Sequence, residues 1–264
     1  MQKNEDRIRK WGRIKAEWIC TVCLALCFLA ILFAQGTVRQ VTVADEKDTK
    51  EQQKTETKKK IAYLTFDDGP SGLTEEYLKI LEEEKVPATF FLIGQQVEGD
   101  MLEIAKKEVA QGHEIGIHTY SHEAEKIYQS KECYCKDLQK TKVCIEEKLK
   151  VTPQLFRFPW GSANAYIRSY KSDVIDQMAC EGMDYADWNV SGEDSVGCPS
   201  VDSIVANVRK DYQKYYDPVI LLHDSASCKA TLQALRPIIK ELKENGYSFQ
   251  TLSKRKRPCH FGEY

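Results

Sequence analysis

The chain has 264 residues, of which 38 are basic and 40 acidic, so its formal net charge is −2. Apolar residues make up 42% of the chain and aromatic residues 10%, which is enough for a core and excludes a wholly disordered protein. A near-neutral charge also argues against binding to duplex nucleic acid, because such proteins usually carry a basic face. The length allows one large domain or two small ones.

Residues 18–36 form an uncharged and mostly apolar run, WICTVCLALCFLAILFAQG. About 20 such residues are enough to span a bilayer as a helix. Residues 1–17 carry more basic than acidic side chains, which favours a cytoplasmic N-terminus and an exported C-terminus. We therefore expect a cytoplasmic basic segment followed by a transmembrane signal-anchor. A cleaved signal peptide is the alternative, because Ala34-Gln35-Gly36 has the small-x-small pattern of a cleavage site.

The rest of the chain divides into three parts by composition. Residues 37–60 are polar and highly charged without an apolar stripe, so burial cannot offset the entropy of ordering them and we expect a linker. Residues 61–253 have the composition of a globular domain. Residues 254–264 begin with the basic run Lys254 to Arg257 and are expected to form a solvated basic tail, with contact to anionic polymers as the alternative.

Short apolar runs alternate with amphipathic segments throughout residues 61–253. The expected strands are 61–66, 88–93, 113–118, 155–158, 182–187, 219–223 and 247–252. The expected helices are 74–84, 100–111, 130–150, 164–181, 202–213 and 229–244. This alternation predicts an α/β fold with a mostly parallel sheet or a barrel, whose chemistry lies at the carboxyl ends of the strands.

Candidate ligands and proton carriers follow the first and third expected strands. Asp67 and Asp68 are adjacent in the run TFDDGP, so one carboxylate can bind a cation while the other handles a proton. An ordinary Asp-Gly turn is the alternative. His118 and His122, in HTYSH, have the i, i+4 spacing that places two side chains on one face of a helical turn, which suits a shared metal. Two unrelated surface histidines are the alternative.

Arg157 and Trp160 follow the fourth expected strand, in the run RFPWG. An arginine at a strand end can hold a carboxylate bidentately and keep it ionised. Trp160 offers a flat apolar surface on which a sugar ring can stack, although a packing role is equally consistent with its type.

The last two rim positions are less distinctive by themselves. Asp187 and Trp188 follow the fifth expected strand, and a buried apolar run that includes Leu221 and Leu222 delivers His223 to the end of the sixth. His113 opens an expected strand and His260 lies in the tail, and for both a structural role is the better interpretation.

Taken in order, TFDDGP, HTYSH, RFPWG, DW and LLH resemble the five motifs of the polysaccharide deacetylases, carbohydrate esterase family 4 with its NodB homology domain. The resemblance covers about residues 60–253. It implies a distorted (β/α) barrel, here preceded by the transmembrane helix, with the substrate groove across its top. Ile117 and Trp160 stand where asparagine and tyrosine are frequent in the family, and neither change removes a reacting group.

The resemblance also implies a division of roles. Asp67 would be the catalytic base, and Arg157 would orient it. Asp68, His118 and His122 would bind a divalent metal, usually zinc.

Two further roles concern the leaving group and the substrate. His223 would be the general acid, and Asp187 would tune it. The backbone N–H of Trp160 would stabilise an oxyanion, and the leucines would form a pocket for the acetyl methyl group. The expected substrate-binding residues are Pro159, Trp160, Gly161, Trp188, Leu221 and Leu222.

These expectations describe a hydrolase that removes the N-acetyl group from N-acetylglucosamine in a cell-envelope polysaccharide. Its partners would be a cell-wall glycan and the membrane, with the catalytic domain outside the cytoplasm. Peptidoglycan is the first choice of substrate, with N-acetylmuramic acid and other N-acetylated glycans behind it. A catalytically silent carbohydrate-binding module and a zinc hydrolase of other amides are the alternatives.

Ten cysteines give little information about function. Three lie in the expected anchor, and an exported location would permit disulfides among the other seven. Because seven is odd, at least one of them is unpaired or paired between chains, and the pairing cannot be deduced from spacing.

Overall fold

The computed structural model of this chain describes residues 59–257 and 259–262. Strand β1 (Lys60–Gly69) lies at the centre of the sheet, and its side chains are buried in an unbroken run from Ala62 to Asp67. Burial on both faces is typical of a central strand in a parallel sheet. β1 pairs in parallel with β2 (Thr89–Ile93) on one side and with β7 (Val219–His223) on the other.

The remaining elements follow the alternation expected from the sequence. The other strands are β3 (Glu114–Thr119), β4 (Leu155–Phe156), β5 (Asp184–Tyr185), β6 (Val190–Ser191) and β8 (Tyr247–Phe249). The helices are α2 (Thr74–Glu84), α3 (Gly99–Ala110), α4 (Ala124–Ile127), α5 (Lys131–Leu149), α6 (Lys171–Cys180), α7 (Val201–Tyr212) and α8 (Lys229–Glu244). Two short 3₁₀ helices are η1 (Gly94–Gln96) and η2 (Leu252–Lys254).

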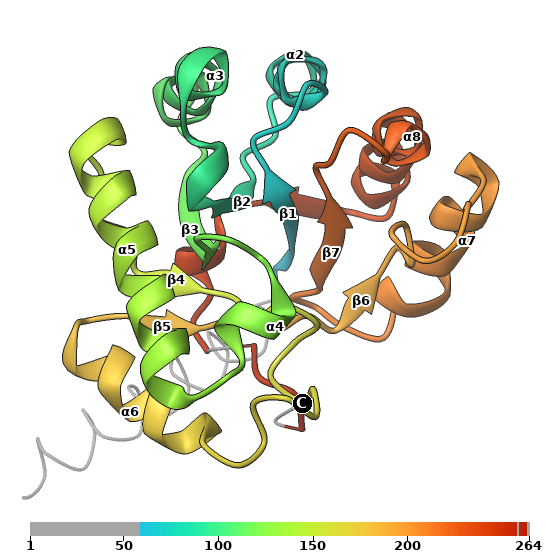
Figure 1. The fold of residues 1–264 in the computed structure, drawn as a ribbon. Coiled ribbons are helices and arrows are strands. Elements are labelled where there is room, and N and C mark those ends of the chain that lie inside the picture. The colour runs from blue at the N-terminus through green and yellow to red at the C-terminus, as the bar shows by residue number, and fades with distance from the viewer. Residues whose placement is uncertain (1–58, 258, 263–264) are drawn as a thin grey trace, which may run out of the picture. The chain divides into compact units, whose positions relative to one another are not determined.

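The sheet curls but does not close into a full barrel. Its strand order is β5-β4-β3-β2-β1-β7-β6, all pairs are parallel, and β8 pairs with the beginning of β1. β5 and β6 are therefore the two edges, and among the described residues they do not pair with each other (Figure 1). The expected parallel α/β fold is confirmed, with a half-barrel in place of a closed one.

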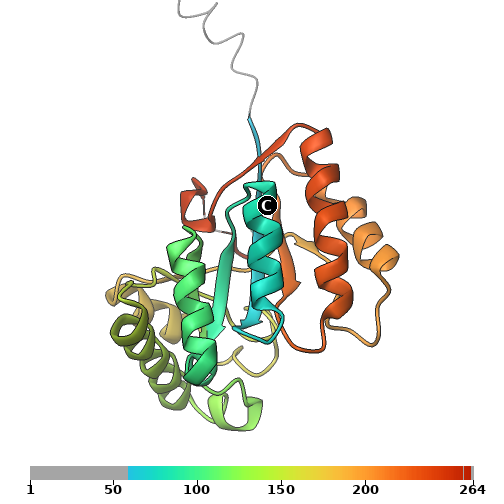
Figure 2. The same cartoon turned by 90° about the horizontal axis from the view of Figure 1, so that it is seen from above.

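Two hydrophobic cores lie on the two faces of this sheet. Leu64 and Phe66 of β1 belong to the larger core, which includes the buried faces of the helices. Figure 2 shows α2, α3 and α8 along that face. Tyr63, which alternates with them, belongs to a smaller core with Phe91 of β2. The alternation follows from the two-residue period of a strand.

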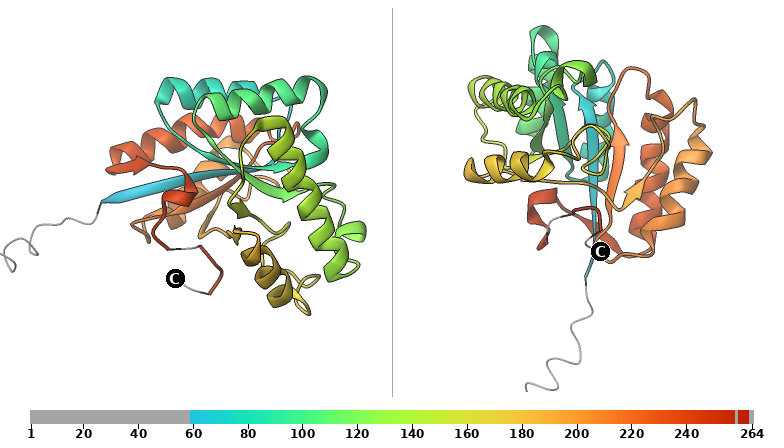
Figure 3. Two further views of the ribbon diagram at one scale, coloured as in Figure 1. Left: turned by 90° about the vertical axis from the view of Figure 1, so that its left-hand side faces the viewer. Right: turned by 60° about the horizontal axis from the view of Figure 1, so that its bottom comes forward.

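The C-terminal segment completes the smaller core. Leu252 and Cys259 pack there, and Cys259 is only 2% exposed. After β8 the chain returns to the face of the sheet opposite α2, α3 and α8 (Figure 3). The expectation of a solvated tail over residues 254–264 agrees with the exposed Lys254, Lys256 and Arg257 but is wrong for the buried Cys259. Apolar side chains at its end anchor it to the domain. The basic run before them made the segment look wholly polar in the sequence.

Other differences are confined to connections. The helix expected over 164–181 begins only at Lys171, because residues 161–170 form consecutive turns. The short elements α4 and β6 were not expected. His118 is the penultimate residue of β3 and His122 lies in the loop after it, so the helical turn expected to carry this pair does not form.

Several sequence predictions fall outside the described residues. These are the cytoplasmic segment 1–17, the signal-anchor 18–36 and the linker up to residue 58. Within residues 59–257 and 259–262 no helix combines the length and apolar character needed to cross a membrane. Six cysteines of the described part, Cys133, Cys135, Cys144, Cys180, Cys198 and Cys228, are free thiols.

Candidate active site

A bulge at the end of β1 separates the two aspartates. The pairing of β1 with β2 shifts register between Asp67 and Gly69, so Asp68 is the extra residue. Asp68 adopts a left-handed backbone with φ of 72°. Because a bulge re-aims the side chains beside it, Asp67 stays buried at 3% exposure while Asp68 reaches the rim. The two carboxylates therefore serve different partners, as expected from the sequence.

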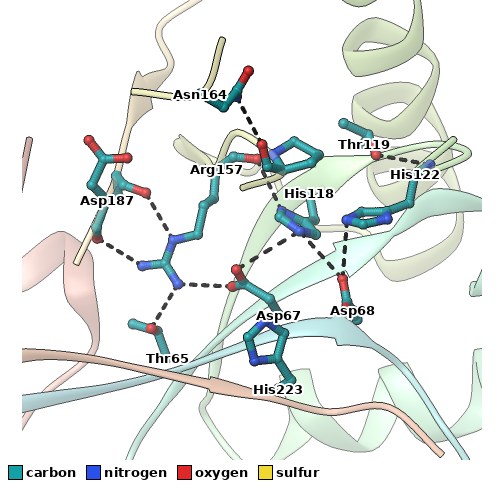
Figure 4. A network of polar contacts seen from close by, with 12 residues as sticks. Thr65, Asp67, Asp68, His118, Thr119, His122, Arg157, Asn164, Asp187 and His223 are labelled. Carbon is teal, nitrogen blue, oxygen red and sulfur yellow. Dashed lines mark hydrogen bonds and ion pairs between the residues drawn. The ribbon is translucent and has the colours of Figure 1, made fainter. Parts of the chain in front are cut away.

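Arg157 is fully buried and joins the ends of three segments (Figure 4). Its Nη1 donates to Asp67 Oδ1 at 2.9 Å and to Thr65 Oγ1 at 2.8 Å. Its Nε and Nη2 donate to the carbonyl oxygens of Ala186 and Asp187. The contact with Asp67 is thus a single hydrogen bond and not the bidentate pair expected, because the other guanidinium N–H groups fix the segment after β5.

Asp68, His118 and His122 converge into a group that could hold a metal ion. His118 Nε2 and His122 Nε2 lie 3.4 and 3.5 Å from Asp68 Oδ1 (Figure 4). That buried oxygen has no hydrogen-bond donor among the described residues. One carboxylate and two imidazoles are ordinary ligands of zinc and similar cations. The residues present therefore fit a divalent metal.

Hydrogen bonding prepares His118 to act as a ligand. Its Nδ1 lies 3.1 Å from the carbonyl oxygen of Arg157, so Nδ1 carries the proton and Nε2 presents its lone pair to the group. Burial lowers the pKa of His118 to about 4, although the charges of Asp67 and Asp68 act in the opposite direction. His118 is consequently neutral at physiological pH, which metal binding requires.

The loop that follows His118 is held in a strained conformation. Thr119 and His122 have positive φ values of 133° and 55°, and Thr119 Oγ1 accepts from the His122 N–H. Asp137 of α5 accepts hydrogen bonds from the Tyr120 N–H and the Ser121 hydroxyl. Strained backbone of this kind persists where its surroundings dictate it, and it concentrates at functional sites. Asp137 is a supporting residue that sequence patterns did not reveal.

The general-acid candidate His223 lies directly beside Asp67. The two residues are register partners in the β1–β7 pairing. His223 Nδ1 lies 2.9 Å from Asp194 Oδ1, and the His223 backbone N–H donates to the other oxygen of Asp194. Burial lowers the pKa of His223, but the hydrogen bond and charge of Asp194, with smaller contributions from Asp67 and Asp68, raise it to about 9.

The expectation that Asp187 tunes His223 is wrong, because Asp194 occupies that position. The carboxylate of Asp187 accepts from the backbone N–H and hydroxyl of Ser162 and from the N–H of Phe261. Its own N–H donates to the Cys259 carbonyl. Asp187 therefore connects the loop after β4, the C-terminal segment and, through its carbonyl, Arg157. Both aspartates follow β5, but Asp187 comes before β6 and Asp194 comes after it. Because β6 pairs with β7, the residue that follows β6 is the one that reaches His223.

The loop after β4 exposes one of the expected substrate contacts. Trp160 is 54% exposed, and its ring centroid lies 5.2 Å from that of His122. Trp160 and Gly161 both have positive φ, 61° and 79°. A Cβ at Gly161 would lie 2.7 Å from the ring of Phe261, so the tight turn requires glycine. The Pro159 carbonyl accepts from Tyr128 and Asn164, which fixes the loop.

The other expected substrate contacts are Trp188, which follows β5, and the two leucines of β7. Trp188 lies over the Arg157 guanidinium and edge-on to Phe261, which makes it a wall of the arginine pocket. Leu221 is on the same face of β7 as His223. Leu222 is on the opposite face, fully buried in the larger core, so its assignment to substrate is wrong. Strand alternation in the sequence already separates Leu222 from His223.

A further buried acid, Asp224, holds the turn after β1. Its carboxylate accepts from the hydroxyls of Ser71 and Thr74, and its N–H donates to the Asp67 carbonyl. Its pKa is raised to about 6, chiefly by burial. Asp224 thus fixes the position of the TFDDGP turn against β7, a role that nothing in the sequence distinguished from a simple surface acid beside His223.

The chain is similar in sequence and in fold to polysaccharide deacetylases. A family model for polysaccharide deacetylase matches residues 54–175. The chain is 30% identical over 260 residues to a peptidoglycan-N-acetylglucosamine deacetylase of Bacillus cereus, covering 90% of this chain and 92% of the relative. It is 30% identical to a chitooligosaccharide deacetylase of a Bradyrhizobium species, covering 72% of this chain and 88% of that one. The fold matches the catalytic domain of a peptidoglycan N-acetylglucosamine deacetylase from Eubacterium rectale with a TM-score of 0.70 and 31% identity, covering 76% and 92% of the two chains.

The chain belongs to the polysaccharide deacetylase family. It is accordingly a hydrolase of carbon–nitrogen bonds other than peptide bonds.

We expect Asp194→Asn to change the pH dependence of the reaction. The alkaline limb of kcat/KM reports loss of the proton from the general acid. Without the Asp194 charge the pKa of His223 falls, so this limb should move to lower pH by about 1 to 3 pH units. Asp187→Asn should leave the position of the limb unchanged. A pH profile in which Asp187→Asn moves the limb and Asp194→Asn does not would mean that Asp187, and not Asp194, tunes His223.

We also expect deletion of residues 259–264 to destabilise the domain. The deletion removes the buried side chain of Cys259, the stacking of His260 on Tyr185 and the contact of Phe261 with Trp188. Loss of such buried contacts should lower the free energy of unfolding by about 2 to 5 kcal/mol. Chemical denaturation measures the change, with Lys256→Ala on the exposed part of the tail as control. An unchanged midpoint would mean that the segment does not stabilise the fold.

Proposed function

We propose that this protein is a metal-dependent deacetylase that removes the N-acetyl group from N-acetylglucosamine units of peptidoglycan and releases acetate. The observation that carries the proposal is the position of Asp67. One carboxylate oxygen accepts from Arg157, the other lies 3.9 Å from His118 at the candidate metal group, and His223 is its neighbour across the sheet. A proton acceptor, a metal group and a proton donor thus meet at one end of the sheet.

Asp67 is suited to act as the general base. Its Oδ1 is engaged by Arg157, which leaves Oδ2 directed toward the space beside His118. A water molecule in that space would lose its proton to Oδ2 as its oxygen attacks the acetyl carbonyl carbon. Arg157 holds the carboxylate in place during this transfer, because its remaining N–H groups bind Thr65 and the segment after β5.

Asp68, His118 and His122 would hold the metal ion, for which zinc is our first choice. A divalent cation there would supply Lewis acidity toward the acetyl oxygen and lower the pKa of a nearby water molecule. The neutral His118 would bind it without losing a proton, and the Asp68 oxygen that lacks a hydrogen-bond donor would gain a partner.

His223 and the loop after β4 would complete the reaction. His223, paired with Asp194, would donate its proton to the amine nitrogen as the carbon–nitrogen bond breaks. The backbone N–H of Trp160 would donate to the oxyanion that forms on the acetyl oxygen, since Trp160 lies beside His122 of the candidate metal group. Leu221, beside His223 on β7, would contact the acetyl methyl group.

The choice of substrate and location rests on relatives and on sequence. Two relatives that cover nearly this whole domain are named for action on peptidoglycan N-acetylglucosamine, which supports that polymer as our first choice. We infer that residues 18–36 attach the protein to the cell membrane with its catalytic domain outside the cytoplasm, where this substrate lies. Cleavage after a signal peptide would give the same domain in secreted form.

Exchange of the base tests the proposal directly. Asp67→Asn keeps the size of the side chain but cannot accept the proton, so acetate release from purified peptidoglycan with zinc present should fall at least about 100-fold. Binding of the protein to the same polymer should persist. Equal acetate release by the wild type and the variant would contradict this role of Asp67, and no release by either would favour a silent binding module.

Metal binding has a readout that does not depend on activity. Zinc that binds the folded state alone raises stability by about 2.7 kcal/mol at 100 times the dissociation constant. We expect zinc to raise the melting temperature of the wild type and of Glu123→Ala, an exposed neighbour. His122→Ala should lose most of this rise. The same rise in all three proteins would place the metal elsewhere.

A further inference from the structure

The C-terminal segment reaches the loop after β4. We call residues 259–262 the C-terminal strap. The Cys259 carbonyl oxygen accepts from the Asp187 N–H at 2.6 Å, and the Phe261 N–H donates to Asp187 Oδ2 at 2.9 Å. Two residues of the strap therefore hold the fully buried Asp187, one by its backbone and one by its carboxylate.

Asp187 also binds the loop after β4. Its Oδ1 accepts from the Ser162 N–H at 2.9 Å, and its Oδ2 accepts from the Ser162 hydroxyl at 2.6 Å. A buried carboxylate is stable only if hydrogen-bond donors surround it. Because the strap and the loop donate to the same carboxylate, they are fixed relative to each other.

The half-buried Phe261 ring packs directly on the turn of that loop. A Cβ at Gly161 would lie 2.7 Å from Phe261 Cε2 and 3.0 Å from Trp188 Cη2, so both rings lie against Gly161. The two rings meet edge-on with centroids 4.9 Å apart. Asn164 holds the carbonyl oxygens of Pro159 and Gly161 by hydrogen bonds, whereas these rings cover the Gly161 Cα.

The turn needs this support because its backbone is strained. Trp160 has a φ of 61°, a left-handed conformation that residues with a side chain adopt only at a cost in free energy. Such a conformation persists where the surrounding structure dictates it. Without the Phe261 ring, the turn could relax toward extended backbone at Trp160, and the direction of the Trp160 N–H would change with it.

We propose that Phe261 is a positioning residue, which keeps the Trp160 N–H directed at the acetyl oxygen of the substrate. The inference rests on the proposed function, in which this N–H stabilises the oxyanion. A phenyl ring carries no proton to transfer and no ligand for a metal, so Phe261 acts through its packing on Gly161. It also lies outside residues 54–175, which the family model matches.

The proposal predicts an effect on the transition state and not on substrate binding. The oxyanion forms only as the acetyl carbonyl is attacked, so a displaced donor weakens an interaction that the bound substrate does not yet make. The values of kcat and kcat/KM should then fall together, while KM stays within about 2-fold. A purely structural role would lower the stability of the domain without this division between kcat and KM.

Phe261→Ala should lower kcat about 5- to 50-fold for acetate release from soluble glycan fragments of peptidoglycan by the full-length, zinc-loaded protein. Outright loss of an oxyanion donor costs roughly 100-fold or more, and displacement costs less. Phe261→Leu, which keeps an apolar side chain against Gly161, should retain most of the activity. Phe249→Ala removes a half-buried phenylalanine from β8, which pairs with the other end of β1, and should leave kcat unchanged. Each variant is assayed well below its melting temperature.

Hydrogen exchange tests the position of the turn without turnover. The Gly161 and Ser162 amides are both hydrogen-bonded in the loop after β4, and Phe261→Ala should speed their exchange about 3-fold or more. The Tyr120 and His122 amides are likewise hydrogen-bonded, but in the loop after β3, and their exchange should stay unchanged.

A lower kcat together with faster exchange confined to the loop after β4 would support the proposal. An unchanged kcat, a loss carried by KM, unchanged exchange, or equally faster exchange in both loops would overturn it. If Phe261→Ala speeds exchange in the loop after β4 alone but the wild type releases no acetate, the hold of Phe261 on the turn would be supported and the proposed function refuted.

Discussion

The buried ion pair of Arg157 and Asp67 is the constraint on which the rest of the site depends. A guanidinium with no exposure is stable only if its N–H groups all find acceptors and its charge is matched. Its acceptors come from β1 and from the segment after β5, and Phe91 of β2 lies under its plane. Removing either partner would leave an unpaired charge in the smaller core. The contact between Arg157 and Asp67 therefore both stabilises the smaller core and positions the proposed base.

A second ion pair holds the other side of the site. Asp194 binds both the backbone and the ring of His223, and Thr231 of α8 donates a hydrogen bond to the same carboxylate. The proton acceptor and the proton donor thus lie on neighbouring central strands, β1 and β7, but take their polar partners from opposite sides of the half-barrel, after β4 and after β6. Because Asp67 is held by Arg157 and His223 by Asp194, a base and an acid with different proton affinities can lie side by side. Acid–base hydrolysis requires such a pair.

Most of the regular structure was predictable because it is encoded locally. The ranges of α2, β7 and α8 agree with the sequence prediction, since each shows a clear period of 3.6 or a short apolar run bounded by breakers. Connections were less predictable. Residues 164–170 were expected to begin a helix, yet the hydrogen bonds of Asn164 hold them in turns. The C-terminal segment looks basic, yet Cys259 and Phe261 anchor it, while most of the basic run before them stays exposed to solvent.

The sequence by itself determined the α/β class, the order of the motifs and the identity of Asp67, Asp68, His118, His122, Arg157 and His223 as a candidate set, because each follows a strand and carboxyl ends of parallel strands meet at one edge. Only the tertiary structure decided which of two aspartates reaches His223, that Trp160 lies beside His122, and that Asp137 supports the loop after β3. These depend on how the sheet curls and how long loops return to it. Such contacts join residues far apart in the chain, and their geometry is set by packing, which no local pattern records.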